Sequence, residues 1–222
     1  MKAIVPIKLQ SERVPNKNFR EFNGKPLFYW IINTLKKVEE IDEIIITMNH
    51  ETVFTKVSKY FDNINYILRP EELRNDNVTA NALIENVLEQ TKGKKFLYTH
   101  TTNPLLTKET VKQSIQDFEN LYPAYDSLLA VTKLLIRAYD ESKRPINHNP
   151  RNIIQTQDLV PIYEDNSHLY IFSRETFNMH GRVGDNPYFA IMNKRDAVDI
   201  DEEEDFILAE LLHKKINEGE QS

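Results

Sequence analysis

Basic side chains cluster directly after a short apolar run over residues 3–7, as Lys8, Arg13 and Lys17, with Ser11 among them. A strand that ends in a basic polar loop, with a helix soon after, is the usual layout for holding a polyphosphate at the carboxyl edge of a parallel sheet. Arginine offers paired donors for phosphate oxygens and lysine a point charge, so together they could neutralise a leaving pyrophosphate. A solvated basic turn is the competing interpretation, because lysine and arginine are surface residues by default.

Glycine is too scarce in this chain for the usual glycine-rich phosphate loops. Only five of the 222 residues are glycine, and neither GxGxxG nor GxxxxGK followed by Ser or Thr occurs. If phosphates bind at the first loop, side chains must supply much of the contact.

Two aspartates, Asp199 and Asp201, are separated by one residue near the end of the chain. On the strand predicted over residues 197–201 they project to the same face, which would allow the two carboxylates to share a magnesium ion. Asp201 could instead cap the final helix, whose acidic first turn suits the positive end of the helix dipole. Asp199 lies inside the apolar run, so the capping interpretation does not account for it.

Further polar side chains follow other predicted strands. Arg69 and Asp76 come after the third strand, and His100 and Asn103 after the fourth. In open α/β sheets the ligand lies outside the carboxyl ends of the strands, so these residues should line one crevice. A lone histidine in such a position is more often a hydrogen-bonded structural residue than a catalyst.

Hydrophobic periodicity predicts an α/β fold. Strands are expected at 3–7, 43–48, 64–68, 96–100, 127–132, 169–172 and 197–201, and helices at 26–35, 51–61, 78–90, 108–120, 174–179 and 202–218. Strands that alternate with helices form βαβ units, so we expect a mostly parallel sheet with helices on both faces. A length of 222 residues suits one domain over the whole chain, 1–222.

The regular pattern breaks between residues 133 and 161, where three prolines lie among Asn, His and Arg. A break of this length inside a compact domain indicates either a flap over an active site or an arm that contacts a second chain.

Composition narrows the class of ligand and the compartment. The net charge of −6 argues against a general nucleic-acid binder, which needs a basic face. No stretch approaches a membrane span or a signal peptide, and there is no cysteine, which is compatible with a reducing cytoplasm. We therefore expect a soluble cytoplasmic protein with a small anionic ligand.

Several segments together resemble the CMP-sugar-acid synthetases, the acylneuraminate cytidylyltransferases and their relatives that act on Kdo. The matching segments are Val5–Asn18, Phe22–Leu27, Arg69–Leu73, Thr102–Leu105 and Val198–Asp201 followed by Glu204–Phe206, in the family's order. The resemblance implies a Rossmann-like nucleotidyltransferase fold with a protruding dimerisation arm at about 133–161, and hence a homodimer. It also implies a Mg²⁺-dependent reaction in which a hydroxyl of an acidic sugar attacks the α-phosphorus of CTP and releases pyrophosphate.

The resemblance assigns roles to individual positions. It implies that Lys8, Arg13 and Lys17 hold the triphosphate and that Asp199 and Asp201 hold the metal, Asp201 being catalytic as well. It implies a binding role for Ser11, Asn18, Arg69, His100 and Asn103, while Asp76 is a binding candidate from its place after the third predicted strand.

Two departures from the family pattern leave alternatives open. Leu9-Gln10 stands where relatives have a small pair, which leaves a non-catalytic nucleotide-binding relative as one alternative. The segment His100–Pro104 stands where sialate enzymes have Gln-Pro-Thr-Ser-Pro. Because that segment helps to form the acceptor pocket, another anionic acceptor such as a phosphonate is the second alternative.

Overall fold

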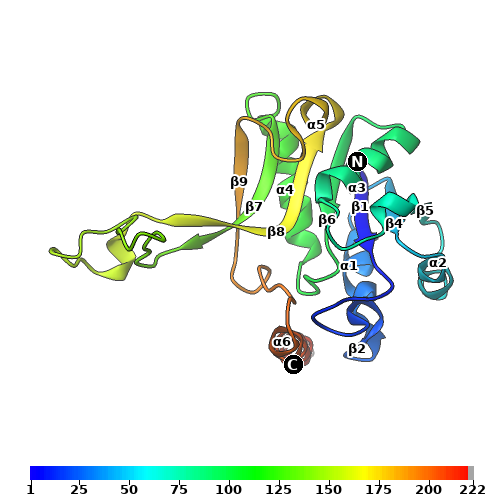
Figure 1. The fold of residues 1–222 in the computed structure, drawn as a ribbon, viewed down its shortest axis with the longest axis horizontal. Coiled ribbons are helices and arrows are strands. Elements are labelled where there is room, and N and C mark those ends of the chain that lie inside the picture. The colour runs from blue at the N-terminus through cyan, green and yellow to red at the C-terminus, as the bar shows by residue number, and fades with distance from the viewer. Residues whose placement is uncertain (220–222) are drawn as a thin grey trace.

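A seven-stranded sheet forms the body of the molecule in the computed structural model, which describes residues 1–219 (Figure 1). Its order is β5-β4-β1-β6-β8-β7-β9. The strands are β1 (Lys2–Ile7), β4 (Glu43–Met48), β5 (Asn65–Leu68), β6 (Lys95–Thr99), β7 (Ser127–Leu134), β8 (Ile162–Ser173) and β9 (Pro187–Met192). Neighbours are parallel except where β8 pairs with β6 and β7, so the expected mostly parallel sheet is confirmed.

Helices cover both faces of this sheet, as expected. They are α1 (Leu27–Leu35), α2 (Thr52–Val57), α3 (Ala80–Gln90), α4 (Lys108–Leu121) and α5 (Arg174–His180). The last helix, α6 (Glu203–Gly219), packs elsewhere, and short 3-10 turns are η1 (Lys17–Phe19), η2 (Glu71–Leu73) and η3 (Thr156–Asp158). One apolar core joins α1, α2 and α4 to the sheet, and a second joins α3 and α5 to the opposite face. Thr107 caps the start of α4, because its hydroxyl accepts from the backbone N–H of Thr110 at 3.2 Å.

A third, smaller apolar cluster joins both ends of the chain. It contains Val14 from the loop after β1, Phe22 from the hairpin of β2 (Glu21–Phe22) and β3 (Lys25–Pro26), and Ile200 and Phe206 from the C-terminal segment. Because all four side chains are buried, the basic loop and the aspartate segment are held against each other.

The prediction of a strand over residues 197–201 is wrong. The last strand is β9, which the sequence reading missed, and residues 193–201 are irregular backbone. The N–H of Ile200 donates to the carbonyl of Thr102 at 2.9 Å, but no strand ladder forms there. Ile200 is therefore apolar because it is buried in the third cluster, and not because its segment pairs in the sheet.

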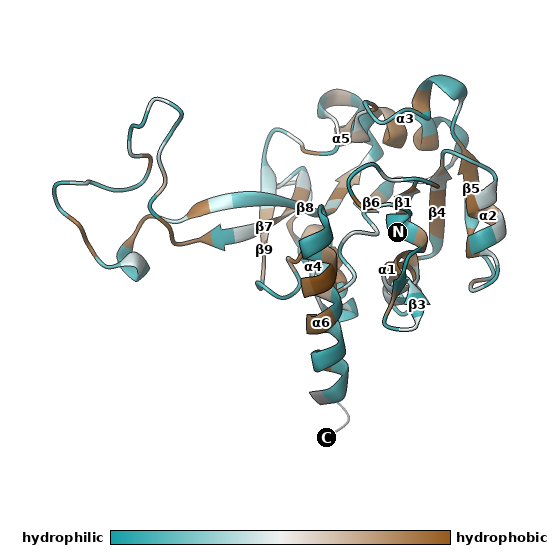
Figure 2. Cartoon of the chain, turned by 60° about the horizontal axis from the view of Figure 1, so that its bottom comes forward, coloured by the Kyte–Doolittle hydropathy of each residue, from teal (hydrophilic) through white to brown (hydrophobic). Residues whose placement is uncertain are grey.

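The predicted break at 133–161 is an arm that projects from the body (Figure 1). Strands β7 and β8 pair as far as Leu134 and Ile162, and the chain between them extends outward without long regular elements. Figure 2 shows apolar stretches along this arm. Among residues 1–219, none of the helices has the length and apolar character that a membrane span requires.

Candidate active site

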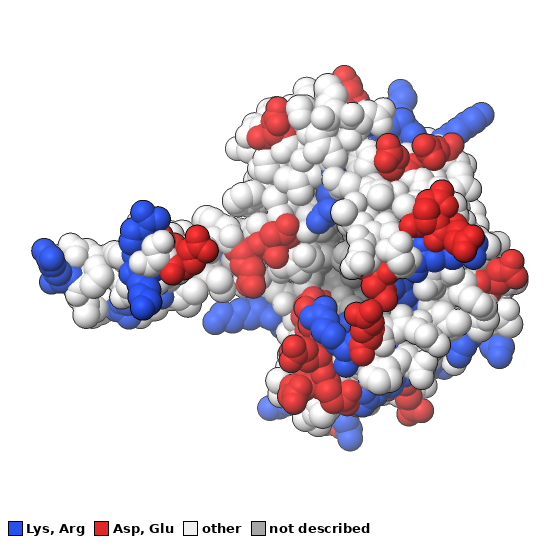
Figure 3. All heavy atoms as spheres, in the orientation of Figure 1, with Lys and Arg blue, Asp and Glu red and all other residues white. Residues whose placement is uncertain are grey.

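A cavity of about 510 Å³ lies where β1 and β6 end, within the size range of small-molecule sites. Figure 3 shows the hollow on this face, with acidic and basic side chains mixed along its rim. The lining residues are Pro6, Lys8, Ser11, Glu12, Arg13, Lys17, Asn18, Asp76, Val78, Ala80, Leu83, Tyr98, His100, Thr101, Thr102, Ser167, Asp199 and Asp201. Parallel strands expose their carboxyl ends at one edge, and this is where segments distant in sequence converge.

Hydrogen bonds fix the basic loop to neighbouring strand ends. The Asn18 side-chain amide donates to the carbonyl of Lys8 at 2.7 Å, and the Thr101 hydroxyl donates to the Asn18 amide oxygen at 2.6 Å. The N–H of Leu9 donates to the Asn49 side-chain oxygen at 2.8 Å. The loop that carries the cations is thus tied to the ends of β6 and β4 without glycine.

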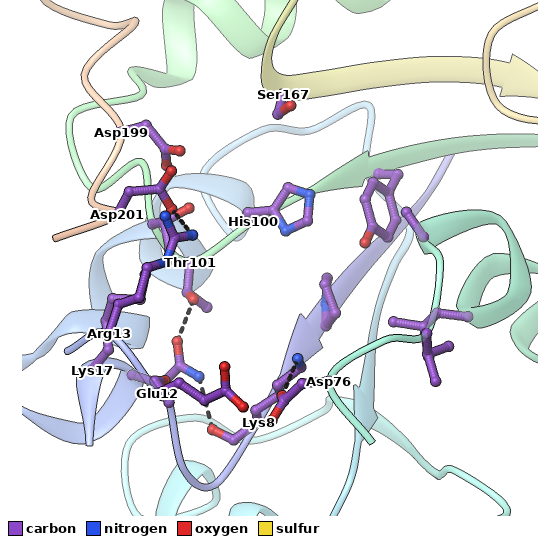
Figure 4. A pocket seen from close by; sticks show the side chains of 18 residues that line it. Lys8, Glu12, Arg13, Lys17, Asp76, His100, Thr101, Ser167, Asp199 and Asp201 are labelled. Atoms are coloured by element: carbon purple, nitrogen blue, oxygen red, sulfur yellow. Dashed lines mark hydrogen bonds and ion pairs between the residues drawn. The ribbon is translucent and has the colours of Figure 1, made fainter. Parts of the chain in front are cut away.

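Two of the loop cations are held by carboxylates across the cavity (Figure 4). Lys8 Nζ lies 2.5 Å from Asp76 Oδ1, and Arg13 Nη2 lies 2.6 Å from Asp201 Oδ1. All four side chains are at least a third exposed, so each pair contributes little net stability. A phosphate could therefore exchange for either carboxylate at small cost.

Lys17 is the buried cation of the loop. Its side chain is held by the carbonyl of Ile200, which accepts from Nζ at 2.6 Å. Burial lowers the pKa of Lys17, while the nearby Asp201 and Asp199 act in the opposite direction. Lys17 thus joins the basic loop directly to the backbone between the two aspartates.

The two aspartates lie on the same side of the cavity, although the segment that carries them is not a strand (Figure 4). Burial raises the pKa of Asp199, and repulsion by Asp201 adds to this, whereas a hydrogen bond from Thr102 opposes it. Two hard oxygen donors beside this cavity suit Mg²⁺, which usually takes one or two carboxylates together with substrate phosphates. No group of three His, Cys, Asp or Glu side chains suited to a metal occurs within residues 1–219, so an all-protein cage is not formed there.

His100 lies at the centre of the cavity wall, with its ring edge-on to Tyr98 at 4.9 Å between centroids. Burial lowers the pKa of His100 to about 4, with the positive charge of Arg182 adding to the effect. The imidazole is therefore neutral at pH 7 and can offer both a donor and an acceptor.

Nine of the eleven candidates singled out in the sequence line this cavity, and Arg69 and Asn103 do not. Arg69 is fully buried: Nε donates to the Thr47 hydroxyl at 3.2 Å and Nη2 to the Thr47 carbonyl at 2.9 Å, while Nη1 has no partner. Burial lowers its pKa to about 10. Asn103 is also buried, and its side-chain oxygen is unpaired.

Sequence reasoning did not single out Glu12 or Tyr98 as site residues. Tyr98 belongs to an apolar strand, and this pattern indicates a core residue. Thr101 and Thr102 belong to the segment His100–Pro104, which was expected at the crevice because strand ends meet at one edge, and both line the cavity.

Comparison with known proteins places these features in one family. The family model described as Cytidylyltransferase matches residues 2–216. The chain is 24% identical over 235 residues to the pseudaminic acid cytidylyltransferase of Campylobacter jejuni serotype O:2, covering 98% of this chain and 97% of that protein. It is 24% identical over 228 residues to the N-acylneuraminate cytidylyltransferase of Escherichia coli O18:K1:H7, covering 97% of this chain and 52% of that protein.

Solved structures agree at the level of the fold. CMP:2-keto-3-deoxy-manno-octonic acid synthetase complexed with CTP superposes with a TM-score of 0.71 at 13% identity, covering 96% of this chain and 98% of that chain. Together with the match of the family model over residues 2–216, the basic loop, the aspartate pair and the sheet edge that unites them identify the chain as a nucleotidyltransferase that belongs to the cytidylyltransferase family.

Proposed function

We propose that this cytidylyltransferase transfers CMP from CTP to an acidic sugar and releases pyrophosphate. An acceptor hydroxyl oxygen would form the new bond to the α-phosphorus as the bond from that phosphorus to the oxygen bridging to the β-phosphate breaks. Pyrophosphate would leave with the bridging oxygen, and the hydroxyl proton would pass to solvent. The observation that carries the proposal is the convergence of the basic loop and the aspartate pair, almost 190 residues apart, on one cavity. The relatives whose names specify pseudaminic acid and N-acylneuraminate support the acidic sugar.

The loop would grip the triphosphate by exchanging partners. Lys8 and Arg13 would leave Asp76 and Asp201 for phosphate oxygens, while Lys17 stays anchored near Ile200. Arginine suits paired phosphate oxygens and lysine a single one. Ser11 and Asn18 line the same stretch and would add neutral donors.

Asp199 and Asp201 would hold Mg²⁺ as the cofactor. The bound ion would neutralise phosphate charge and orient the triphosphate. Release of Asp201 from Arg13 would free a carboxylate for the metal at the same time as it frees a guanidinium for phosphate.

Arg69 would contribute to recognition of the nucleotide base from beneath the cavity. Its buried Nη1 lacks an acceptor, and its charge acts on Asp76 and Tyr98, which line the cavity. A base carbonyl would satisfy this donor, whose unpaired burial is otherwise costly.

The active form would be a cytoplasmic homodimer joined through the arm, residues 133–161. The arm exposes Ile136, Tyr139, Ile146, Ile153 and Val160, each with 47% or more of its surface accessible. Apolar side chains concentrated on a projecting segment are typical of a protein interface.

The test is pyrophosphate release with CTP and Mg²⁺ against a panel of N-acetylneuraminate, pseudaminate, Kdo and a phosphonate. We expect turnover with at least one sugar acid, with UTP and ATP as nucleotide controls. Turnover with the phosphonate and with none of the sugar acids would show that the acceptor is a phosphonate and not an acidic sugar. Tight CTP binding with no pyrophosphate release from any acceptor would show a non-catalytic nucleotide-binding protein.

A further inference from the structure

Among residues 1–219, Arg182 has no charged partner, although it stands beside the cavity. It lies in the loop between α5 and β9, with its guanidinium carbon 4.5 Å from the centroid of the Tyr170 ring. It donates to the Asn81 side-chain oxygen at 3.3 Å and forms a side-chain hydrogen bond with Tyr170, but its buried Nε has no acceptor. Within residues 1–219 no carboxylate lies at ion-pair distance from it. An uncompensated guanidinium with an orphan donor is costly unless a ligand uses it.

A second arginine on the same face shows what a structural arginine looks like here. Arg174 also lies over an aromatic ring, that of Phe96, at 5.2 Å. In contrast to Arg182, it donates to three backbone carbonyls, those of Leu88, Thr91 and Gly93, at 2.8–2.9 Å. Arg174 is therefore fully used by the fold, whereas Arg182 is not.

The loop that carries Arg182 is held tightly in place. The Asp126 carboxylate accepts from the N–H groups of Asp185 at 2.7 Å and Asn186 at 3.2 Å. A Cβ at Gly184 would lie 2.0 Å from Asp126 Oδ1, so this position requires glycine while that carboxylate clasps the loop. Gly181 adopts a φ of +83°, and a Cβ there would lie 2.5 Å from the Asn81 side chain.

The neighbours of Arg182 place it at the cavity wall away from the basic loop. Tyr170 pairs across the sheet with Tyr98, and its hydroxyl lies 3.5 Å from Ser167 Oγ; both Tyr98 and Ser167 line the cavity. Asn81 lies between Ala80 and Leu83, which also line it. The positive charge of Arg182 is felt by His100 at the centre of the wall.

The balance of charges in the cavity bears on the role of Arg182. Three basic and four acidic side chains line the cavity, and the basic ones belong to the loop assigned to the triphosphate. An acceptor carboxylate would therefore meet no free cation among the lining residues. We propose that Arg182 binds the carboxylate of the acidic acceptor and thereby selects acids over neutral sugars. This rests on the proposed transfer of CMP to an acidic sugar.

The test compares Arg182→Met with wild type, using the sugar acid that turns over and its methyl ester. Methionine keeps apolar contact with Tyr170 but removes the charge. Loss of a charge-assisted hydrogen bond should raise the KM for the acid about 10- to 100-fold while the KM for CTP stays unchanged. Wild type should strongly prefer the acid over the ester, and Arg182→Met should show little preference. Arg182→Lys should recover part of the preference.

Two further variants separate binding from structure. The matched control Arg174→Met should lower the Tm without changing the KM for the acid. Gly184→Ala should displace the loop and raise the KM for the acid with the KM for CTP unchanged, as expected if Asp126 positions Arg182.

Three outcomes would overturn the inference: an unchanged KM for the acid in Arg182→Met, retained preference for the acid over its ester, or a rise in the KM for CTP instead. Failure of the proposed function looks different, because wild type would then bind CTP but release no pyrophosphate with any acid. In that case calorimetry measures whether the sugar acid binds to the CTP-loaded protein. Absence of binding to wild type would contradict the role of Arg182.

Discussion

The carboxylates of this site differ in the direction in which their surroundings shift their pKa values. Asp76 has its pKa lowered by the hydrogen bond from Lys8, and it stays ionised close to the loop that would bind phosphate. Asp199 lies in the opposite situation, since burial and Asp201 raise its pKa. A divalent cation would relieve the repulsion between Asp199 and Asp201, and this supports the proposed role of the two aspartates as metal ligands.

The variant Asp201→Asn tests that assignment at the residue scale. Removing one of two carboxylate ligands should lower the apparent affinity for Mg²⁺ and the rate of pyrophosphate release by about 100-fold or more, since loss of outer partners alone costs about 10- to 100-fold. The measurement is the rate as a function of Mg²⁺ concentration. Glu204→Gln is the matched control, because it removes an exposed negative charge three residues away.

The control should behave as wild type. A normally folded Asp201→Asn protein with the wild-type rate and the same Mg²⁺ dependence would rule out Asp201 as a ligand.

At the scale of elements, the position of the aspartates depends on α6 and the β2–β3 hairpin. The N–H of Asn23 donates to the Glu210 carboxylate at 2.9 Å, and its amide group donates to the Glu210 carbonyl at 2.8 Å. His213 packs against Trp30 at 4.1 Å between ring centroids. The backbone N–H of Asp201 donates to the Asp205 carboxylate at 3.0 Å, so the start of α6 and the aspartate segment are one unit.

Burial of His213 predicts how this unit responds to acid. Burial lowers the pKa of His213, so the folded state prefers the neutral ring and protonation favours unfolding. The stability contributed by this preference is present above the ordinary histidine pKa of about 6.5 and is lost as the pH falls toward the lowered value.

We therefore expect the Tm of wild type to fall more steeply between pH 7.5 and 5 than that of His213→Phe, with a shift of about 2–4 °C for each kcal/mol lost. Thermal unfolding followed by circular dichroism measures both profiles. His148→Phe, a change within the arm, serves as the control and should follow the wild-type slope. Parallel profiles for wild type and His213→Phe would show that His213 does not titrate with unfolding.

At the scale of the whole molecule, the arm is distinct because packing within the body does not bury its apolar side chains. It departs from the paired ends of β7 and β8 and projects from the body (Figure 2). Apolar side chains of the arm are exposed. Ile153 and Ile154 are 71% and 43% exposed. The dimer that the resemblance implies would bury such side chains, and this remains a prediction.

Sedimentation equilibrium tests the dimer directly. Wild type should show twice the 26.1 kDa mass of one chain. The double variant Ile153→Asp/Ile154→Asp should raise the Kd of the dimer by at least about tenfold, because a buried unpaired charge is strongly unfavourable. The variant Ser142→Asp/Asn149→Asp adds the same charge at polar arm positions and should remain dimeric. A monomeric wild type at micromolar concentration would contradict the proposal.

Much of the architecture was predictable because its signals are local. Unbroken apolar runs indicate strands such as β4, helical spacing indicates α1, and Thr107 in front of Lys108 indicates the start of α4. The error at residues 197–201 has the same origin. An apolar residue flanked by polar ones indicates burial of Ile200, but whether a strand or another surface buries it depends on distant residues.

The sequence by itself determined most of the strands and helices, though not β9, together with the cationic loop and the carboxylate pair, because residue type and periodicity are properties of short segments. It also carried the family resemblance, which the comparisons confirm. Only the tertiary structure decided which polar groups meet. Packing Ile200 against Val14 brings Asp201 to Arg13. Contacts with Thr47 hold Arg69 away from the cavity lining, and Asn81 and the Tyr170 ring hold Arg182 near the cavity with its Nε unpaired. The Arg13–Asp201 pair joins residues 188 positions apart, and no local pattern records it.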